Sequence, residues 1–252
     1  MRKITLKFAA AASLCCILGT SILASCKKDD EVKDDCQRVT YSELDLPDVG
    51  SNSSKYGITD EDIQGHAKEL GVEAAALEAV RKVDTGGRGG FIHDGNSGSL
   101  PLLLFQGHIF WQQLRSRGIN PQDHVKGNED ILYQRLDKTK YVGGLGEYEH
   151  LERAIKIDEE AALSSASWGM FQIMGYNYGS CGCESVKEFV NGMKESESAQ
   201  YGLFINYLKS HPSMVNALKN RDWKTFAKLY FGPTYAQNRY DDKLAKAYSS
   251  LK

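Results

Sequence analysis

The chain has 252 residues, of which 41% are hydrophobic and 25% are charged, and its formal net charge is −2. A chain of this length and composition can form one well-packed domain with extensions. Because acidic residues slightly outnumber basic ones and no basic stripe runs along the sequence, we expect no nucleic-acid partner.

The first 25 residues have the pattern of a bacterial export signal. Three basic residues lie among the first seven, and Phe8 to Leu23 is apolar but too short and too rich in small residues for a convincing membrane span. The block L-A-S-C that ends at Cys26 resembles a lipobox, in which the cysteine becomes the lipidated first residue of the mature protein. An ordinary secretory signal that happens to contain a cysteine is the alternative.

The segment that follows Cys26 is predicted to be a tether. It is polar as far as about Tyr56 and rich in Asp and Ser, which is typical of a flexible linker. Acyl chains on Cys26 would hold the protein at a membrane without a spanning helix, so we expect a lipid-anchored protein of the cell envelope, at the outer membrane. The sequence thus divides into a signal peptide over 1–25, a tether over 26–56 and one domain over 57–252.

Three cysteines remain once the signal is removed and Cys26 is acylated, namely Cys36, Cys181 and Cys183. The export route is oxidising, so one bridge from Cys36 to the C-G-C pair is open, although the sequence does not establish it. A C-x-C pair without further Cys or His at zinc spacing is weak evidence for a metal site. We therefore expect neither a metal nor another cofactor.

Beyond the tether, the pattern predicts a domain that is mainly α with a minor β piece. Thr59 is a suitable N-cap, and the acidic residues after it begin a helix that ends near Gly71. An apolar stripe predicts a second helix over 72–84, and turn signals predict a small hairpin within 91–104. The other helices are expected over 102–114, within the polar stretch 121–148, and over 151–163, 185–210, 214–220, 223–230 and 238–251.

The segment from Ser164 to Tyr178 reads S-S-A-S-W-G-M-F-Q-I-M-G-Y-N-Y and mixes a dense apolar run with small and amide side chains. This mixture predicts a wall that is packed behind and polar in front. Gly169 would let a ligand or another backbone approach closely, and Gln172 offers a donor and an acceptor to hydroxyl and acetamide groups. A buried helix with an ordinary kink is the alternative.

The block S-W-G-M-F-Q-I-M-G resembles the signature of lysozyme-like glycosidases, and it is most similar to that of the N-acetylmuramidase domain of phage endolysins. In that family the block follows an acidic, alanine-containing helix, as D-E-E-A-A-L does from Asp158. The resemblance runs from about Ile58 to Lys252, through A-L-E-A-V-R-K-V-D, L-F-Q-G-H-I-F-W and Y-F-G-P-T-Y-A-Q-N-R-Y-D-D-K-L-A. It implies a lysozyme-like helical domain with a small β-hairpin, and a hydrolase that cleaves the β-1,4 glycosidic bond of peptidoglycan by acid catalysis.

The resemblance places the catalytic acid at Asp84. In the family a glutamate closes the first core helix in a V-E-S-G-G context, whereas this chain has V-D-T-G-G, with a side chain one methylene shorter. A carboxyl group at a helix C-terminus feels the negative end of the dipole, and apolar surroundings disfavour its ionised form, so both would keep it protonated. A cap on the following glycine turn is the alternative role for Asp84.

A second acidic position of the family is also changed. The family block L-F-E-x-H is L-F-Q-G-H in this chain, so Gln106 keeps hydrogen bonding but cannot act as a base. An inverting mechanism needs that base, whereas an amide suffices if the position only holds substrate or a water molecule. Asp94 and Glu147 are polar acids, predicted in loops, that could replace the lost carboxylate, and we expect His108 to be a satisfied histidine near a helix start.

Near the C-terminus, the segment from Tyr230 to Tyr235 resembles the family block Y-N-G-P-x-Y. Proline and glycine fix a turn, and tyrosines offer flat apolar faces with a hydroxyl at the rim, which suits a sugar, although these rings could be core instead. The residues expected to bind substrate are Gln106, Ser167, Gln172, Tyr230, Tyr235 and Asn238.

Two functions follow from this reasoning. The first is a membrane-anchored peptidoglycan hydrolase with Asp84 as general acid. The second is a peptidoglycan-binding lipoprotein that retains the glycan cleft but hydrolyses slowly or not at all, because both acidic positions of the family are altered. The sequence does not choose between inverting, retaining and lytic chemistry, or between self and foreign peptidoglycan.

Overall fold

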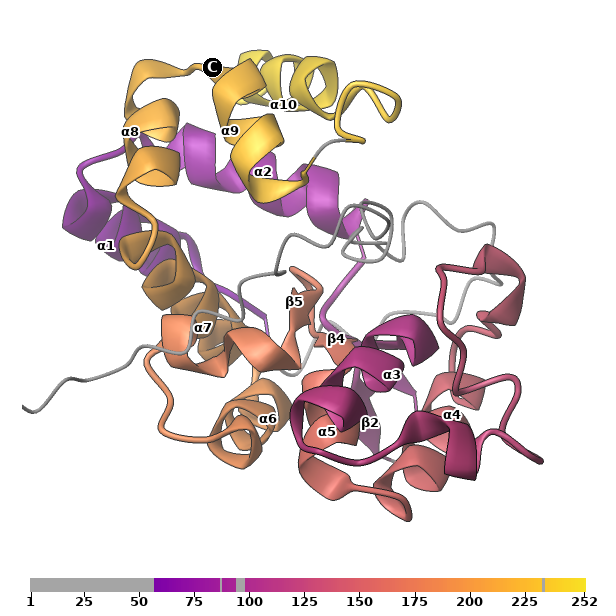
Figure 1. The fold of residues 1–252 in the computed structure, drawn as a ribbon. Coiled ribbons are helices and arrows are strands. Elements are labelled where there is room, and N and C mark those ends of the chain that lie inside the picture. The colour runs from indigo at the N-terminus through magenta and orange to yellow at the C-terminus, as the bar shows by residue number, and fades with distance from the viewer. Residues whose placement is uncertain (1–56, 87, 94–97, 233) are drawn as a thin grey trace, which may run out of the picture. The chain divides into compact units, whose positions relative to one another are not determined.

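The computed structural model describes residues 57–86, 88–93, 98–232 and 234–252 (Figure 1). The expected signal peptide and tether, with Cys26 and Cys36, lie outside these residues, as does Asp94. Within the described part, no helix combines the length and the apolar character that a membrane crossing requires. Cys181 is buried, Cys183 is partly buried, and both are free thiols in this part of the chain.

The first two helices form as the local sequence predicts. Helix α1 (Asp60–Leu70) begins at a capping box, because the Thr59 side chain accepts from the Asp62 N–H and the Asp62 carboxylate accepts from the Thr59 N–H, each at 3.1 Å. It ends at Gly71, which has a φ of 64°. Helix α2 (Ala74–Thr85) buries its apolar stripe, and Asp84 lies in its last turn.

Two small sheets follow, of which the sequence predicted only one. Strands β1 (Phe91–His93) and β2 (Ser99–Pro101) pair antiparallel and form the expected hairpin. The second sheet has the order β3-β4-β5 and consists of Leu103–Phe105, Ala166–Trp168 and Ile173–Met174. The helix expected from residue 102 therefore begins later, as α3 (Gly107–Ser116), because residues 103–105 pair with strand residues that lie 61 to 65 positions further along the sequence.

The remaining helices match the expected regions but are more divided. The run expected over 151–163 is split in two, because Asp158 caps a new helix by accepting from the Ala161 N–H at 2.8 Å. The run expected over 185–210 is split at Ser196, which caps the next helix in the same way. These elements are η3 (Pro121–His124), η4 (Lys138–Lys140), α4 (Gly146–Ile155), α5 (Glu159–Ser164), η5 (Gly175–Cys181), α6 (Val186–Glu195), α7 (Glu197–Lys209), α8 (Pro212–Asn220), α9 (Trp223–Tyr230) and α10 (Tyr240–Ser249).

The central segment joins two groups of elements. Helix α10 packs on α2 and α9 packs on α10, whereas α3, α4 and α5 lie around the β3-β4-β5 sheet (Figure 1). Phe171, in the turn between β4 and β5, stacks on Phe204 of α7 with ring centroids 3.9 Å apart, and its carbonyl oxygen accepts from the Tyr230 hydroxyl of α9 at 3.3 Å. The segment predicted to be a packed wall is thus two buried strands and a turn rather than a kinked helix.

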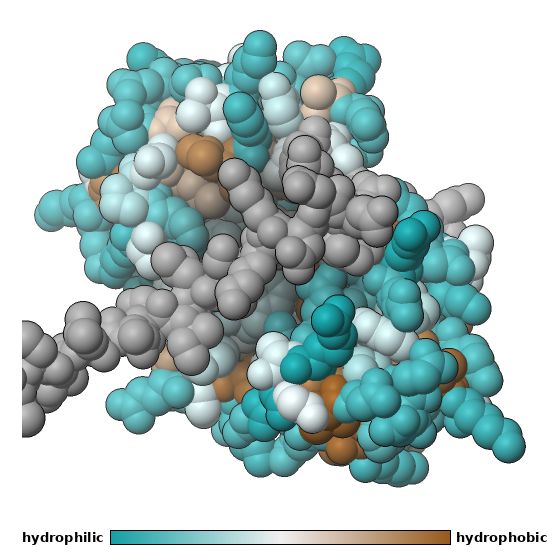
Figure 2. Space-filling view, viewed as in Figure 1, coloured by the Kyte–Doolittle hydropathy of each residue, from teal (hydrophilic) through white to brown (hydrophobic). Residues whose placement is uncertain are grey.

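The surface seen in Figure 2 is mostly hydrophilic outside the grey residues, and its hydrophobic areas are small and separate. Four large hydrophobic side chains are more than a third exposed among the described residues, namely Val142, Leu145, Tyr176 and Leu229. Scattered exposure of this kind is ordinary for a globular domain. Tyr176 and Leu229 are of interest because both line the same pocket.

Candidate functional site

The Asp84 carboxyl group is bound by two tyrosine hydroxyls. Tyr230, at the end of α9, donates to Oδ2 at 2.5 Å, and Tyr240, at the start of α10, donates to Oδ1. Asp84 is partly buried, whereas the two tyrosines are only 4% and 3% exposed. Two C-terminal helices therefore deliver one hydroxyl group to each oxygen of a carboxyl group at the end of α2.

Aromatic packing holds these two hydroxyls in place. The Tyr230 ring stacks on Phe226 with centroids 5.2 Å apart, and the Tyr240 ring stacks on Phe231 at 4.7 Å. A tyrosine hydroxyl carries a single proton to donate. The shorter contact of Tyr230 is the one to Asp84, so its 3.3 Å contact with the Phe171 carbonyl is secondary.

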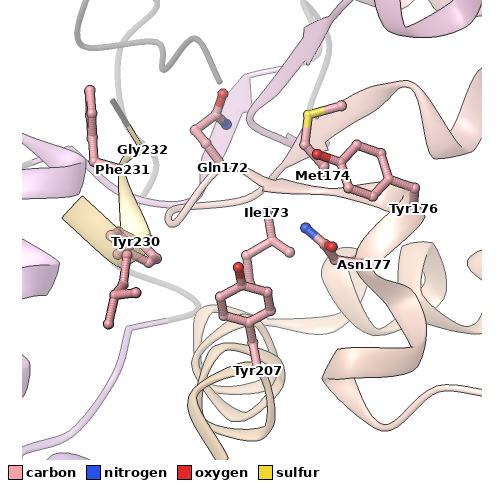
Figure 3. Close-up of a pocket in the computed structure, with 10 residues that line it drawn as sticks. Gln172, Ile173, Met174, Tyr176, Asn177, Tyr207, Tyr230, Phe231 and Gly232 are labelled. Carbon is pink, nitrogen blue, oxygen red and sulfur yellow. The ribbon is translucent and has the colours of Figure 1, made fainter. Parts of the chain in front are cut away.

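A pocket of about 170 Å³ is lined in part by Tyr230, one of the two tyrosines that bind Asp84. Tyr230 connects the pocket to Asp84, because it lines the pocket while its hydroxyl binds the Asp84 carboxyl group. Figure 3 shows Tyr176 and Asn177 on one side, Tyr230 on the other, and Tyr207 and Ile173 between them. The complete lining is Gln172, Ile173, Met174, Tyr176, Asn177, Tyr207, Leu229, Tyr230, Phe231 and Gly232. Aromatic faces mixed with amide and hydroxyl groups are suited to binding a sugar.

Gln172 has an unusual backbone at the edge of this pocket. Its φ is 47°, in the left-handed region that residues other than glycine rarely adopt. Its side-chain amide is held by the protein, because Oε1 accepts from the Ser167 hydroxyl at 3.0 Å and Nε2 donates to the Gly169 carbonyl at 2.9 Å. Such strain occurs at functional sites, where the surrounding structure maintains it.

The close approach expected at Gly169 exists, and the group that approaches is protein. A Cβ at this position would lie 2.7 Å from Oε1 of Gln200. That oxygen accepts from the Met170 N–H at 2.9 Å, while Nε2 of Gln200 donates to the Met193 carbonyl at 2.8 Å. Gly169 therefore admits a side chain of α7 that fixes the turn between β4 and β5.

Residues 73–252, more than two thirds of the chain, match the model of the N-acetylmuramidase family. The chain belongs to the N-acetylmuramidase family. Its structure is also similar to the crystal structure of the endolysin of Burkholderia phage AP3, with a TM-score of 0.70 and 34% sequence identity over 78% of this chain and 72% of that one. No curated protein gives a significant match. The mostly helical fold with two small sheets is thus that of a lysozyme-like endolysin domain, and the family identifies it as a peptidoglycan hydrolase.

In this muramidase domain, Gln106 lies near the pocket but not in its wall. Its side chain is fully buried, and Nε2 donates to the Met174 sulfur at 3.0 Å. Met174 lines the pocket, so it separates the Gln106 amide from a bound molecule. A role in substrate binding for Gln106 therefore requires Met174 to move.

His108 and Glu147 differ from what the sequence suggested. His108 is fully buried in the first turn of α3, and neither ring nitrogen has a hydrogen-bond partner among the described residues, so the prediction of a satisfied histidine is wrong. Burial lowers the pKa of this imidazole to about 4. Glu147 is no loop acid, because it lies fully buried in the first turn of α4.

The Glu147 carboxylate is occupied by backbone groups. Oε2 accepts from the Phe105 N–H at 2.9 Å, and Oε1 accepts from the N–H groups of Val142 and Gly143 at 2.8 and 2.9 Å. These bonds attach the loop before α4 to strand β3. Glu147 therefore has a structural task, which does not fit the idea that it replaces the lost catalytic carboxylate.

Of the other expected site residues, Ser167 is fully buried beside Gln172, while Tyr235 and Asn238 lie in the turn between α9 and α10. The Tyr235 carbonyl accepts from the Tyr240 N–H at 3.0 Å, and the Asn238 amide donates to the Thr234 carbonyl at 3.4 Å. Neither lines the described pocket. In the described part of the chain, no group of three or more His, Cys, Asp or Glu side chains could hold a metal ion.

Sequence reasoning missed Tyr240 as a partner of Asp84, and Tyr176, Asn177 and Tyr207 as pocket residues. Tyr240 is 156 residues from Asp84, so no local spacing could connect them. Tyr176 and Asn177 directly follow the family block that ends at Gly175, and this proximity was the signal that could have found them.

Proposed function

We propose that this chain cleaves the β-1,4 bond that follows N-acetylmuramic acid in peptidoglycan, with Asp84 as the general acid. One observation carries the proposal, namely that the Asp84 carboxyl group binds the hydroxyl of a tyrosine that lines a pocket of aromatic, amide and hydroxyl groups. Glycosidases need a carboxylic acid that protonates the leaving glycosidic oxygen, and the sequence resemblance to the family assigns this role to Asp84.

In the proposed step, the Asp84 proton passes to the glycosidic oxygen while the bond from that oxygen to the anomeric carbon breaks. The bonding electron pair goes to the leaving oxygen, and the sugar becomes oxocarbenium-like. None of the residues that line the described pocket carries a carboxylate. Capture of the cation therefore falls to a water molecule or to a hydroxyl of the sugar itself, which leaves hydrolytic and lytic products as the two outcomes to be distinguished.

The alternative is a glycan-binding protein with little or no catalysis. The absence of a carboxylate from the described pocket lining favours it, as does the amide of Gln106 at the second acidic position. In this alternative, the same pocket would bind a glycan strand without breaking it.

A comparison of the wild type with Asp84→Asn decides between these functions. Purified cell walls are incubated with each protein, and the soluble products are reduced and identified by mass spectrometry. We expect muropeptides with a terminal N-acetylmuramic acid from the wild type and at least a hundredfold less from Asp84→Asn, because general acids contribute roughly 10²–10⁴-fold. If Asp84→Asn matches the wild type, Asp84 is not the acid. If both proteins bind insoluble walls but neither releases product, the binding function replaces the enzymatic one.

We also propose that the mature protein is anchored in the cell envelope by lipid on Cys26. The proposal is supported by the sequence L-A-S-C at the end of the apolar segment. Cells grown with a clickable fatty acid should label the mature chain, and Cys26→Ala should abolish the label and release the protein from the membrane fraction. A label that persists in Cys26→Ala would contradict the lipobox.

A further inference from the structure

We propose that Tyr230 and Tyr240 control the acidity of the Asp84 carboxyl group, as positioning residues that bind the anion left when the proton is delivered. The inference rests on the proposed role of Asp84 as the acid. It is carried by geometry, because each carboxyl oxygen has its own hydroxyl donor, and each donor comes from a different helix.

The two hydroxyls also compensate for the short side chain. An aspartate carboxyl group can rotate, and a misplacement of about 1 Å can reduce the rate of proton transfer roughly a hundredfold. Hydroxyl groups on both oxygens fix the plane of the carboxyl group. Their rings are themselves fixed by stacking on Phe226 and Phe231, so the donors keep their positions while the charge develops.

The electrostatic consequence has a definite sign. Donors to both oxygens favour the ionised form of the carboxyl group over its protonated form. They make Asp84 a stronger acid toward the glycosidic oxygen, but they also reduce the fraction of molecules that carry the proton at neutral pH. The enzyme should therefore be most active at acidic pH, and its activity should fall on the alkaline side as Asp84 loses its proton.

Charged groups on α2, α9 and α10 also influence the acidity of Asp84, independently of the two tyrosines. Arg81, one turn earlier on α2, is paired with Glu78 at 2.5 Å. The Arg88 guanidinium, after α2, approaches the Thr85 carbonyl at 3.5 Å. The remaining charged side chains of these helices are Lys82 on α2, Lys224 and Lys228 on α9, and Asp241, Asp242, Lys243 and Lys246 on α10. Tyrosine-to-phenylalanine substitutions leave all of them unchanged.

The direct test is a ¹³C NMR titration of the Asp84 carboxyl carbon in the full chain. Asp84→Asn identifies the signal, and Tyr230→Phe, Tyr240→Phe and the double variant each remove hydroxyls but keep the rings. We expect the titration midpoint to rise by about one pH unit for each hydroxyl removed. Tyr201→Phe is the matched control, because its hydroxyl is buried without a hydrogen-bond partner among the described residues and its ring contacts Phe171 in the same aromatic cluster.

The pH dependence of wall hydrolysis gives the second reading. The alkaline limb should move to higher pH in both phenylalanine variants and stay in place in Tyr201→Phe, while the maximal rate falls. A carboxyl midpoint that is unchanged in both variants, with thermal melting showing folded protein, overturns the inference. If the midpoint rises but no protein hydrolyses walls, the control of acidity is supported and the proposed function fails. A shift of the acidic limb instead would show that Asp84 acts as an anion, which overturns its role as the acid.

Discussion

Two carboxyl groups of this domain, those of Glu147 and Asp84, are bound in different ways. Glu147 is fully buried and accepts from three backbone N–H groups near strand β3. Asp84 is only partly buried and binds two side-chain hydroxyls beside a pocket. Backbone donors cannot withdraw without moving the chain, whereas a tyrosine hydroxyl can turn. This difference supports the proposal that Asp84, rather than Glu147, exchanges a proton with a ligand.

Glu147→Gln tests the structural role of Glu147 and should destabilise the folded protein. The amide keeps the volume of the side chain, but its NH₂ group must face at least one of the backbone N–H groups that the carboxylate binds. Because a buried donor without a partner costs roughly 1–3 kcal/mol and the charge is also lost, we expect the free energy of unfolding to fall by roughly 3 kcal/mol. Urea denaturation measures it, with Glu149→Gln on the same helix as the control. A loss of activity without a loss of stability would instead assign Glu147 to the chemistry.

His108 should lower the stability of the folded protein at acidic pH. Its pKa in the folded protein is about 4, below the ordinary value of 6.5, so between these two pH values the unfolded chain binds a proton that the folded chain does not. Stability must then fall as the pH falls through this window, by roughly 2 kcal/mol between pH 7.5 and 4.5. Urea denaturation at both pH values measures the difference, and it should shrink in His108→Gln. An equally large acid loss in that variant would show that other groups cause it.

Asp84→Glu tests the proposed role of Asp84 as the acid. It gives the glutamate that the sequence resemblance implies for this position, and we expect wall hydrolysis to rise about tenfold, because about 1 Å of misplacement costs roughly a hundredfold and the tyrosine contacts already recover part of that loss. The release of reducing ends from purified walls measures the change. A fall in rate would show that the two hydroxyls, placed for the shorter side chain, matter more than reach.

Gln172→Ala and Tyr235→Ala test whether the glycan contacts the β4–β5 turn or the turn between α9 and α10. Gln172 lines the pocket, whereas Tyr235 does not, so Gln172→Ala should weaken pull-down on insoluble peptidoglycan by about threefold, because it removes the amide that holds Ser167 and Gly169 at the pocket wall. Tyr235→Ala should change binding less, and thermal melting shows whether either variant is unfolded. A stronger effect of Tyr235→Ala would place the glycan over the turn between α9 and α10.

The helices and strands that could be predicted from the sequence depend on contacts between residues that are close together along the chain. The capping box at Thr59 and Asp62 needs only the geometry of one helical turn, and the β1–β2 hairpin joins neighbouring segments. Asp84 could be placed at the end of α2 from the glycines that follow it. By contrast, Leu103–Phe105 contains three apolar residues that suit a helix or a strand equally, and only the partner strand Ala166–Trp168 decides for the strand.

The sequence by itself determined the family, the mostly helical class and the place of Asp84 at the end of a helix, because each of these depends on short stretches of consecutive residues. Only the tertiary structure decided what surrounds that acid. Tyr230 and Tyr240 reach Asp84 from 146 and 156 residues away, and Glu147 reaches Phe105 from 42 residues away. The physical reason is that a hydrogen bond depends on positions in space, which the packing of α10 on α2 and of α9 on α10 provides and no spacing along the chain records.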